Sequence, residues 1–175
     1  MKNFKEQLHH VKAFAFDVDG VFTDGTVLIH PSGELLRTSN TRDGYAVHKA
    51  IRQGFPVAII SGGTSESVRE RFKGLGVADI YLGASDKVEA LNDFCLKHGI
   101  EFSQILYMGD DLPDYEVMQR VGFPTCPADA APEIVEISTY ISSFGGGKGC
   151  VRDVIEQVLK LKGLAAGTDQ ALQAV

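Results

Sequence analysis

The sequence predicts an α/β domain in which helices cover both faces of a central parallel sheet. Short apolar runs, typical of buried strands, alternate along the chain with longer amphipathic segments, typical of helices. The chain has 175 residues, 44% of them hydrophobic. This size and composition fit one globular domain with a full core. We therefore expect a single three-layer, Rossmann-like domain.

The expected elements follow from the apolar runs in chain order. Strands are predicted at 11–18, 57–60, 79–82, 105–108 and 122–124, and helices at 44–53, 65–74, 87–98, 112–121 and 148–161. Asp86 and Glu89 fall in the first turn of the helix that begins near Ser85, where acidic side chains stabilise a helix N-terminus. The domain is expected to span residues 1–162. Residues 163–175, rich in Ala, Gly and Gln, are predicted to form a flexible tail.

Residues 26–39 break this alternation. Two apolar runs flank the turn-rich tetrapeptide His30-Pro31-Ser32-Gly33, a pattern that predicts a β-hairpin. An isolated hairpin is marginally stable in water, so its apolar positions need a partner. We expect the hairpin to pack against neighbouring subunits. The alternative is that it folds over its own sheet.

Composition excludes several classes of protein. The net charge of −6 disfavours a nucleic-acid partner, which calls for a basic face. No apolar run has the length of a membrane span, and the first residues lack the apolar core of a signal peptide. Three widely separated cysteines without metal-ligand spacing indicate reduced structural thiols, and hence a cytoplasmic protein.

The most informative segment is Asp17-Val18-Asp19-Gly20, which ends the first apolar run. Residues two apart on a strand point to the same side, so Asp17 and Asp19 should project together from its carboxyl end. Ligands bind at that edge of an open α/β sheet. Crowded carboxylates suit Mg²⁺, and an aspartate can also act as a nucleophile. The alternative is a helix cap or a turn.

Three more polar groups fall where a strand meets a loop or a helix begins. Ser61 ends the second apolar strand, and Lys87 opens an amphipathic helix. A cluster of aspartates follows the strand 105–108, at Asp110, Asp111 and Asp114. This order of acid, hydroxyl, lysine and acid resembles the four motifs of the haloacid dehalogenase (HAD) phosphatases over residues 11–160.

Within that superfamily, the chain resembles the capless phosphatases of 3-deoxy-D-manno-octulosonate (KDO) 8-phosphate. The similarity lies in the segments 16–25, 40–44 and 145–153. It implies a HAD fold without a cap domain and a Mg²⁺-dependent hydrolysis of a sugar acid phosphate in lipopolysaccharide precursor synthesis. It also implies a homotetramer with hairpins at its centre, in which the segment Gly145–Gly149 reaches a neighbouring active site.

The resemblance also implies a role for each motif residue. Asp17 attacks phosphorus and carries the phosphoryl group, while Asp19 protonates the leaving oxygen and later activates water. Ser61 and Lys87 hold the phosphoryl oxygens, an arrangement that agrees with phosphoryl transfer being mainly positioning and charge neutralisation.

The implied metal ligands are Asp17, the backbone carbonyl of Asp19, and Asp110. Asp111 and Asp114 would orient these ligands and Lys87.

By the same resemblance, the sugar site is lined by Asn40, Thr41, Arg42, Asp43, Gly44, His48 and Arg71. The two arginines are suited to a carboxylate. Surface ion pairing is the alternative for them, and a solvated helix face for His48. One departure is clear: the family generally has Thr-Gly-Arg after the second strand, and this chain has Ser61-Gly62-Gly63. Either another cation substitutes for the missing guanidinium, or the substrate differs.

Two other functions stay open at the level of sequence. One is a phosphatase for a nine-carbon 2-keto-3-deoxy sugar acid 9-phosphate. The other, from a different class, is a non-catalytic HAD-like oligomerisation module.

The Gly-rich segment 145–149 could equally be a flexible loop before the last helix. Cys150, without an activating base nearby in sequence, is expected to be a small packing residue.

Overall fold

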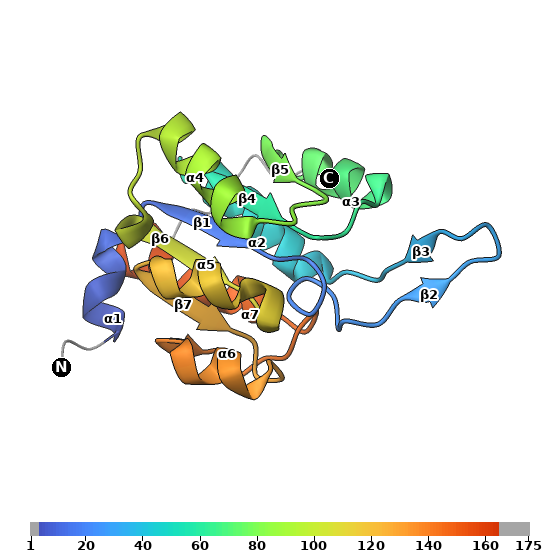
Figure 1. Cartoon of the computed structure of the whole chain (residues 1–175). Coiled ribbons are helices and arrows are strands. Elements are labelled where there is room, and N and C mark those ends of the chain that lie inside the picture. The colour runs from blue at the N-terminus through green and yellow to red at the C-terminus, as the bar shows by residue number, and fades with distance from the viewer. Residues whose placement is uncertain (1–3, 165–175) are drawn as a thin grey trace.

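The structure, a computed structural model, describes residues 4–164. Within these residues a six-stranded sheet has the order β5-β4-β1-β6-β7-β8, and every neighbouring pair is parallel (Figure 1). The strands are β1 Ala13–Phe16, β4 Val57–Ile60, β5 Asp79–Tyr81, β6 Ile105–Met108, β7 Phe123–Cys126 and β8 Tyr140–Ile141. The predicted parallel α/β architecture is thus confirmed.

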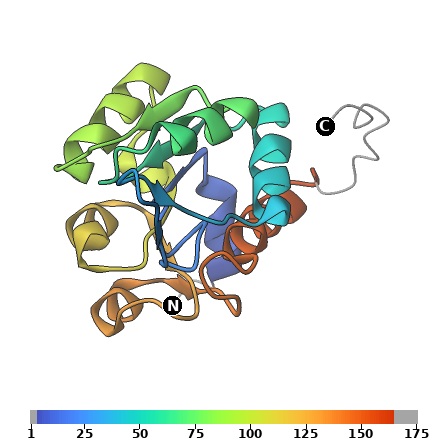
Figure 2. The same ribbon diagram turned by 90° about the vertical axis from the view of Figure 1, so that its right-hand side faces the viewer.

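Helices cover both faces of this sheet (Figures 1 and 2). The α-helices are α1 Phe4–Gln7, α2 Thr41–Arg52, α3 Glu66–Gly74, α4 Lys87–His98, α5 Tyr115–Arg120, α6 Pro132–Ile137 and α7 Cys150–Leu161. Short 3₁₀ turns occur at η1 Leu8–His10, η2 Phe102–Gln104 and η3 Leu112–Asp114. No helix of the part described here is both long enough and apolar enough to cross a membrane.

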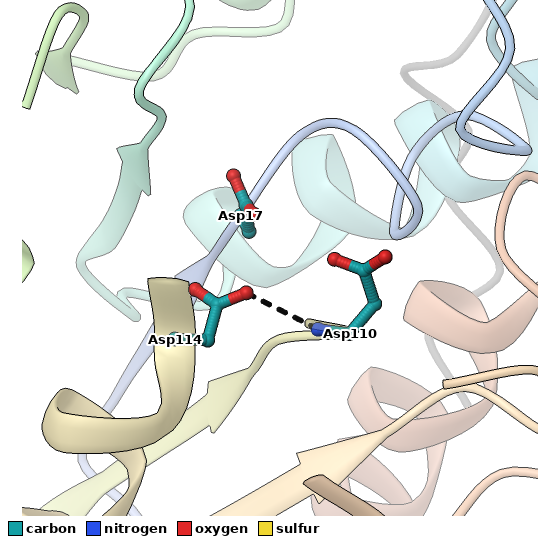
Figure 3. Close-up of side chains that lie close together, drawn as sticks. All are labelled: Asp17, Asp110 and Asp114. Carbon is teal, nitrogen blue, oxygen red and sulfur yellow. Dashed lines mark hydrogen bonds between the residues drawn. The ribbon is translucent and has the colours of Figure 1, made fainter. Parts of the chain in front are cut away.

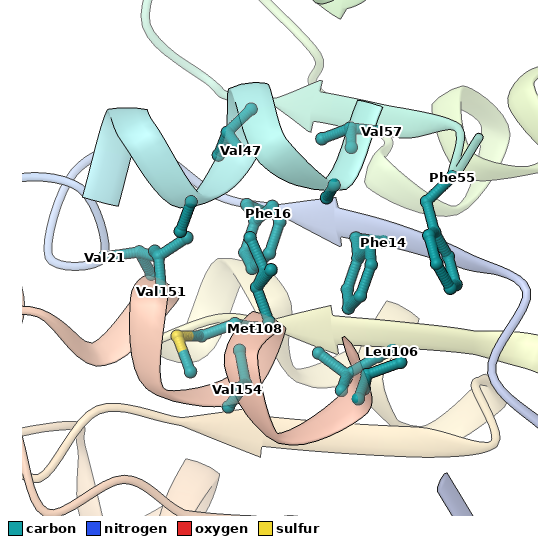
Figure 4. Close-up of a cluster of buried hydrophobic side chains, with 14 of the residues drawn as sticks. Phe14, Phe16, Val21, Val47, Phe55, Val57, Leu106, Met108, Val151 and Val154 are labelled. Atoms are coloured by element: carbon teal, nitrogen blue, oxygen red, sulfur yellow. The ribbon is translucent and has the colours of Figure 1, made fainter. Parts of the chain in front are cut away.

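The core divides into two halves because side chains alternate along β1. Phe14 and Phe16 face α2 and α7 (Figure 4). Ala13 and Ala15 face the opposite side, which α4, α5 and α6 cover. All four residues are fully buried. Because both faces of β1 are covered, the strand is held firmly. The point at which the chain leaves the sheet after β1 is therefore fixed.

The helix boundaries differ from the predicted ones where local caps decide them. The helix predicted from residue 44 begins at Thr41, because the Asn40 side chain accepts the Arg42 N–H at 2.8 Å. The helix predicted from 148 begins at Cys150, after Gly149 with φ +111°. The segment 112–121 is a 3₁₀ turn followed by the short helix α5, with Pro113 in the turn.

The hairpin is present and stands away from the sheet (Figure 1). Strands β2 Leu28–Ile29 and β3 Leu35–Leu36 pair antiparallel around a turn in which Gly33 has φ +86°. Leu28 and Ile29 are 68% and 73% exposed. The hairpin therefore does not fold over the sheet of its own chain. Between Asp19 and Ser61 the chain forms only this hairpin, α2 and the sheet strand β4, so no cap domain is inserted.

The predicted tail, 163–175, lies outside the described residues from 165 onward. Leu164 still belongs to the domain, because it packs against the core and its N–H donates to the carbonyl of Leu159.

Candidate active site

One cavity of about 380 Å³ opens at the carboxyl ends of the central strands. It is placed there because β1 lies between β4 and β6, so the loops that follow these three strands meet at one edge. Six of the predicted catalytic and metal-site residues line it: Asp17, Asp19, Ser61, Lys87, Asp110 and Asp111. The seventh, Asp114, is fully buried beneath it.

Lys87 is the centre of a buried ionic cluster. Its Nζ lies 2.8 Å from Asp17 Oδ2 and 2.7 Å from Asp114 Oδ1. Burial acts to lower the pKa of Lys87, but the charges of Asp17 and Asp114 outweigh it, and the pKa is raised. Lys87 therefore stays charged and holds a positive charge next to Asp17.

Asp114 positions other groups of the site. Its Oδ1 accepts from both Lys87 and the Tyr107 hydroxyl, each at 2.7 Å, and its Oδ2 accepts the Asp110 backbone N–H at 3.2 Å (Figure 3). The sequence reasoning missed Tyr107, because it lies within the apolar run of β6. Its fully buried hydroxyl completes the hydrogen bonding of the Asp114 carboxylate.

The carboxylates of the site fit a divalent cation. Oxygens of Asp17, Asp110 and Asp114 lie within 4.8 Å of one another, and their loops bring them into one space (Figure 3). Burial, together with the charges of Asp114 and Asp111, raises the pKa of Asp110 to about 7. Burial also raises the pKa of Asp17 well above its usual range, with Asp114 adding to the effect and Lys87 opposing it.

The Asp110 carboxylate has fewer hydrogen bonds than that of Asp114. Within residues 4–164 no side chain donates a hydrogen bond to its carboxylate, which receives only its own backbone N–H, whereas the Asp114 carboxylate accepts three donors. Gly20 makes room for it, because a Cβ on Gly20 would lie 1.8 Å from Asp110 Oδ2. Hard, all-oxygen ligands crowded at one point are the donor set that Mg²⁺ prefers. Asp17 and Asp110 would hold the ion, and Asp114 would orient them.

Asp19 is held by a residue that the sequence reasoning also missed. Arg37 Nε donates to Asp19 Oδ1 at 2.6 Å, and Arg37 Nη2 donates to Asp19 Oδ2 at 3.1 Å. Arg37 follows β3, so the hairpin carries it back to the site. A Cβ on Gly63 would lie 3.5 Å from Arg37 Nη2. A guanidinium thus lies beside the position where the family resemblance led us to expect one.

The residues expected to line the sugar site do not line the cavity of Asp17 within this chain. Thr41 and Arg42 are exposed. His48 Nδ1 lies 3.2 Å from the Leu75 carbonyl oxygen. Arg71 crosses Gly44, where a Cβ would lie 2.6 Å from Arg71 Nη2, and it lines a neighbouring cavity of about 240 Å³ together with Arg37. Their part in substrate binding stays a prediction.

Asn40 and Asp43 fasten the Gly-rich segment to the domain. The Asn40 side chain donates to the Gly147 carbonyl, and buried Asp43 accepts the backbone N–H groups of Gly149 and Arg152. Gly146 packs so closely on the loop after Asp19 that a Cβ would lie 2.0 Å from the Gly20 carbonyl oxygen. The glycines of this segment therefore have a role within their own chain.

Cys150 is buried, as expected of a packing residue, and burial raises the pKa of its thiol to about 12.

The fold and this acidic site together define a HAD-like hydrolase. The family model described as haloacid dehalogenase-like hydrolase matches residues 72–149. The chain is 36% identical to 3-deoxy-D-manno-octulosonate 8-phosphate phosphatase KdsC of Escherichia coli K12 over 154 residues, 88% of this chain and 82% of that protein. The Yersinia pestis enzyme of the same name is 35% identical over 86% of this chain and 80% of its own length.

Solved structures agree with these relatives. The Moraxella catarrhalis KDO 8-phosphate phosphatase, in complex with magnesium ion, phosphate ion and KDO, matches with a TM-score of 0.90 and 34% identity, covering 94% of this chain and 95% of that one. A putative KDO 8-phosphate phosphatase from Vibrio cholerae has a TM-score of 0.88 and 40% identity over 91% and 89% of the two chains. The chain belongs to the KDO 8-phosphate phosphatase family. The predicted family, fold and enzyme class are confirmed.

Proposed function

We propose that this chain is a Mg²⁺-dependent phosphatase that removes phosphate from KDO 8-phosphate in lipopolysaccharide precursor synthesis. The observation that carries the proposal is the single cavity in which Asp17, Asp19, Ser61, Lys87 and Asp110 meet. The Moraxella relative, whose structure holds magnesium, phosphate and KDO, supports both the ion and the substrate.

The reaction has two displacements. An Asp17 carboxylate oxygen attacks phosphorus, and the bond from phosphorus to the sugar oxygen breaks as Asp19 gives that oxygen a proton. Asp19 then takes a proton from water, whose oxygen attacks the same phosphorus and releases Asp17 and inorganic phosphate. Lys87 and Ser61 hold the phosphoryl oxygens throughout. Asp17, Asp110 and the Asp19 carbonyl would hold Mg²⁺, which would supply positive charge to neutralise the phosphoryl group.

A nine-carbon sugar acid 9-phosphate is the second candidate substrate. The observation that favours it is Gly63, which lacks the guanidinium expected at that position. The third candidate, a non-catalytic HAD-like module, is disfavoured because every motif residue is present and Lys87 already bridges Asp17 and Asp114.

A substrate panel tests the proposal. Purified protein with Mg²⁺ is assayed on KDO 8-phosphate, a nine-carbon 2-keto-3-deoxy sugar acid 9-phosphate, and neutral sugar phosphates, with Asp17→Asn as the blank. We expect the highest kcat/KM for KDO 8-phosphate. A higher value for the nine-carbon acid would assign the second function, and no activity above the blank would leave only the third.

The assembly we propose is a homotetramer held together by the hairpins. Val27, Leu28, Ile29 and Leu35 expose apolar surface that a second chain would cover. The Gly145–Gly149 segment would reach a neighbouring active site with the exposed side chain of Lys148 and the exposed Phe144 that precedes it. We further propose a cytoplasmic enzyme built on a single domain.

A further inference from the structure

All three nitrogens of the Arg37 guanidinium donate hydrogen bonds beside the active site. Nε and Nη2 donate to the two carboxylate oxygens of Asp19, and Nη1 donates to the Leu35 carbonyl at 2.8 Å. The Arg37 side chain is only 12% exposed. Such a two-point pair fixes orientation as well as charge.

This pair conflicts with the role of Asp19. A proton transfer needs one Asp19 oxygen facing the leaving sugar oxygen, and here each oxygen accepts an N–H from Arg37. A proton on one of these oxygens, or a turn of the carboxylate towards the leaving group, weakens at least one of these hydrogen bonds. Another anion beside Arg37 would compensate for that loss, because the guanidinium would keep a partner of opposite charge.

A second cavity, which Arg37 also lines, offers a place for such an anion. This cavity, of about 240 Å³, is lined by two guanidinium groups, those of Arg37 and Arg71, and by the polar residues Thr23, Ser39 and Ser67. The remaining lining residues are apolar, and no acidic side chain of the described chain lines this cavity. Arg71 has no carboxylate partner anywhere in residues 4–164. The side chains that line this cavity therefore suit the binding of a carboxylate.

We propose that Arg37 determines specificity by exchanging Asp19 for the carboxylate of the substrate. In the free protein Arg37 binds both oxygens of Asp19. When a sugar acid phosphate binds, its carboxylate forms ion pairs with Arg37 and Arg71 in the second cavity. An Asp19 oxygen then becomes free to face the leaving group. Arg37 thereby replaces the cation missing at Gly63. This inference rests on the proposed sugar acid phosphatase activity.

The test compares two substrates in the same variants. Wild type, Arg37→Ala, Arg37→Lys and Arg71→Ala are assayed on KDO 8-phosphate and on an aryl phosphate without a carboxylate. We expect Arg37→Ala to lower the ratio of kcat/KM for the acid to kcat/KM for the aryl phosphate by at least about 30-fold, with a smaller fall for Arg71→Ala. Arg37→Lys should restore little, because an ammonium cannot bind in two-point fashion.

Two further variants separate this role from a general loss of structure. Arg120→Ala, which removes an exposed arginine paired with Glu116 on α5, should leave the ratio unchanged. The double variant Arg37→Ala with Gly63→Arg should recover part of the ratio. Residue 63 has no positive φ, and its Cβ would lie beside the Arg37 guanidinium, so an arginine there can reach the same space.

The outcomes are distinct. If Arg37→Ala lowers kcat/KM equally on both substrates, Arg37 only positions Asp19. That result would refute the proposed exchange of Asp19 for the substrate carboxylate. If wild type instead hydrolyses phosphate esters without preferring a sugar acid, the proposed function fails. In that case the same variants are compared on 3-phosphoglycerate and glycerol 3-phosphate. These differ in the carboxylate, and a ratio unaffected by Arg37→Ala would refute the inference in that case too.

Discussion

Asp17, which directly follows β1, and Lys87, the first residue of α4, form a buried ion pair with 2.8 Å between Oδ2 and Nζ. The pair places a cation beside the carboxylate that we propose attacks phosphorus. A charged pair at this depth is costly unless each member has further partners. Lys87 has Asp114, and Asp17 accepts the Val18 N–H at 2.6 Å.

Asp17→Asn should abolish turnover and leave the fold intact. The substitution keeps the size of the side chain but removes the nucleophile, and we expect kcat to fall by at least about 1,000-fold. Phosphate release is measured in the steady state, with thermal unfolding as the control for structure. Appreciable release by a folded variant would refute covalent catalysis by Asp17.

Asp110→Asn should stabilise the metal-free protein in a manner that depends on pH. The folded-state pKa of Asp110 is about 7, above its ordinary value of 3.8. As pH rises, the Asp110 carboxyl therefore loses its proton at a lower pH in the unfolded chain than in the folded one. Asp110 therefore destabilises the fold increasingly from about pH 4 to about pH 7. The variant should gain about 1–2 kcal/mol over wild type at pH 8, a figure reduced for partial exposure, and less at pH 5.5.

The same variant tests the metal assignment. Mg²⁺ should raise the Tm of wild type at pH 8, because binding to the folded state stabilises it, and should raise that of Asp110→Asn much less. Activity should disappear after exhaustive chelation and return with Mg²⁺. An equal Mg²⁺ effect on the two proteins, or full activity after chelation, would place the ion elsewhere.

Tyr107→Phe should reduce both stability and turnover. It removes a buried hydroxyl that donates to charged Asp114 at 2.7 Å, and such a bond contributes about 1.5–3 kcal/mol. Because Asp114 also holds Lys87 and the Asp110 backbone, we expect kcat to fall as well. Urea unfolding and steady-state kinetics measure the two effects. A variant with wild-type values in both would show that Tyr107 does not support the site.

Replacing Val27 and Ile29 by Asp should disrupt the assembly. Charge placed in a buried interface costs several kcal/mol. Light scattering should show a tetramer for wild type and a smaller species for the variant. Leu96→Asp is the matched control, because Leu96 is 75% exposed on α4, away from the hairpin. A tetramer that survives the double change, or a monomeric wild type, would contradict the hairpin interface.

Gly146→Ala should destabilise the protein even as a single chain. The new methyl group would lie 2.0 Å from the Gly20 carbonyl oxygen, and relieving this overlap costs about 1–3 kcal/mol. Because Gly20 follows Asp19, activity should fall too. Gly74→Ala, at a position with nothing within 4 Å, is the control. If both variants have the stability and the activity of wild type, the Gly-rich segment does not support the loop after Asp19.

The central strands could be predicted because each is a strong apolar run that ends in a polar motif. Ile105–Met108 and Val57–Ile60 were predicted to the residue. Strand β8, Tyr140–Ile141, and helix α6, Pro132–Ile137, were missed, since two residues at a sheet edge and six helical residues carry too little periodicity.

The motif residues of the site were predicted for a similar reason, since parallel strands carry their carboxyl ends to one edge. Arg37 and Tyr107 were not predicted, because each acts through a contact that only the fold creates. Arg37 meets Asp19 through the return of the hairpin, and the Tyr107 hydroxyl is hidden within an apolar run. A polar atom inside β6, and a cation at the base of a hairpin beside the site, were the only signals available.

The strand order has a consequence for how the enzyme becomes active during synthesis. β1 is made first among the strands, yet its two neighbours in the sheet are β4 and β6. Asp17 therefore has no fixed position until residues 57–60 and 105–108 have been added, and Asp110 and Asp114 follow directly after. Contacts so distant in sequence form slowly. A nascent chain shorter than this cannot bind or hydrolyse a phosphate ester, so activity should arise in a single late step of folding.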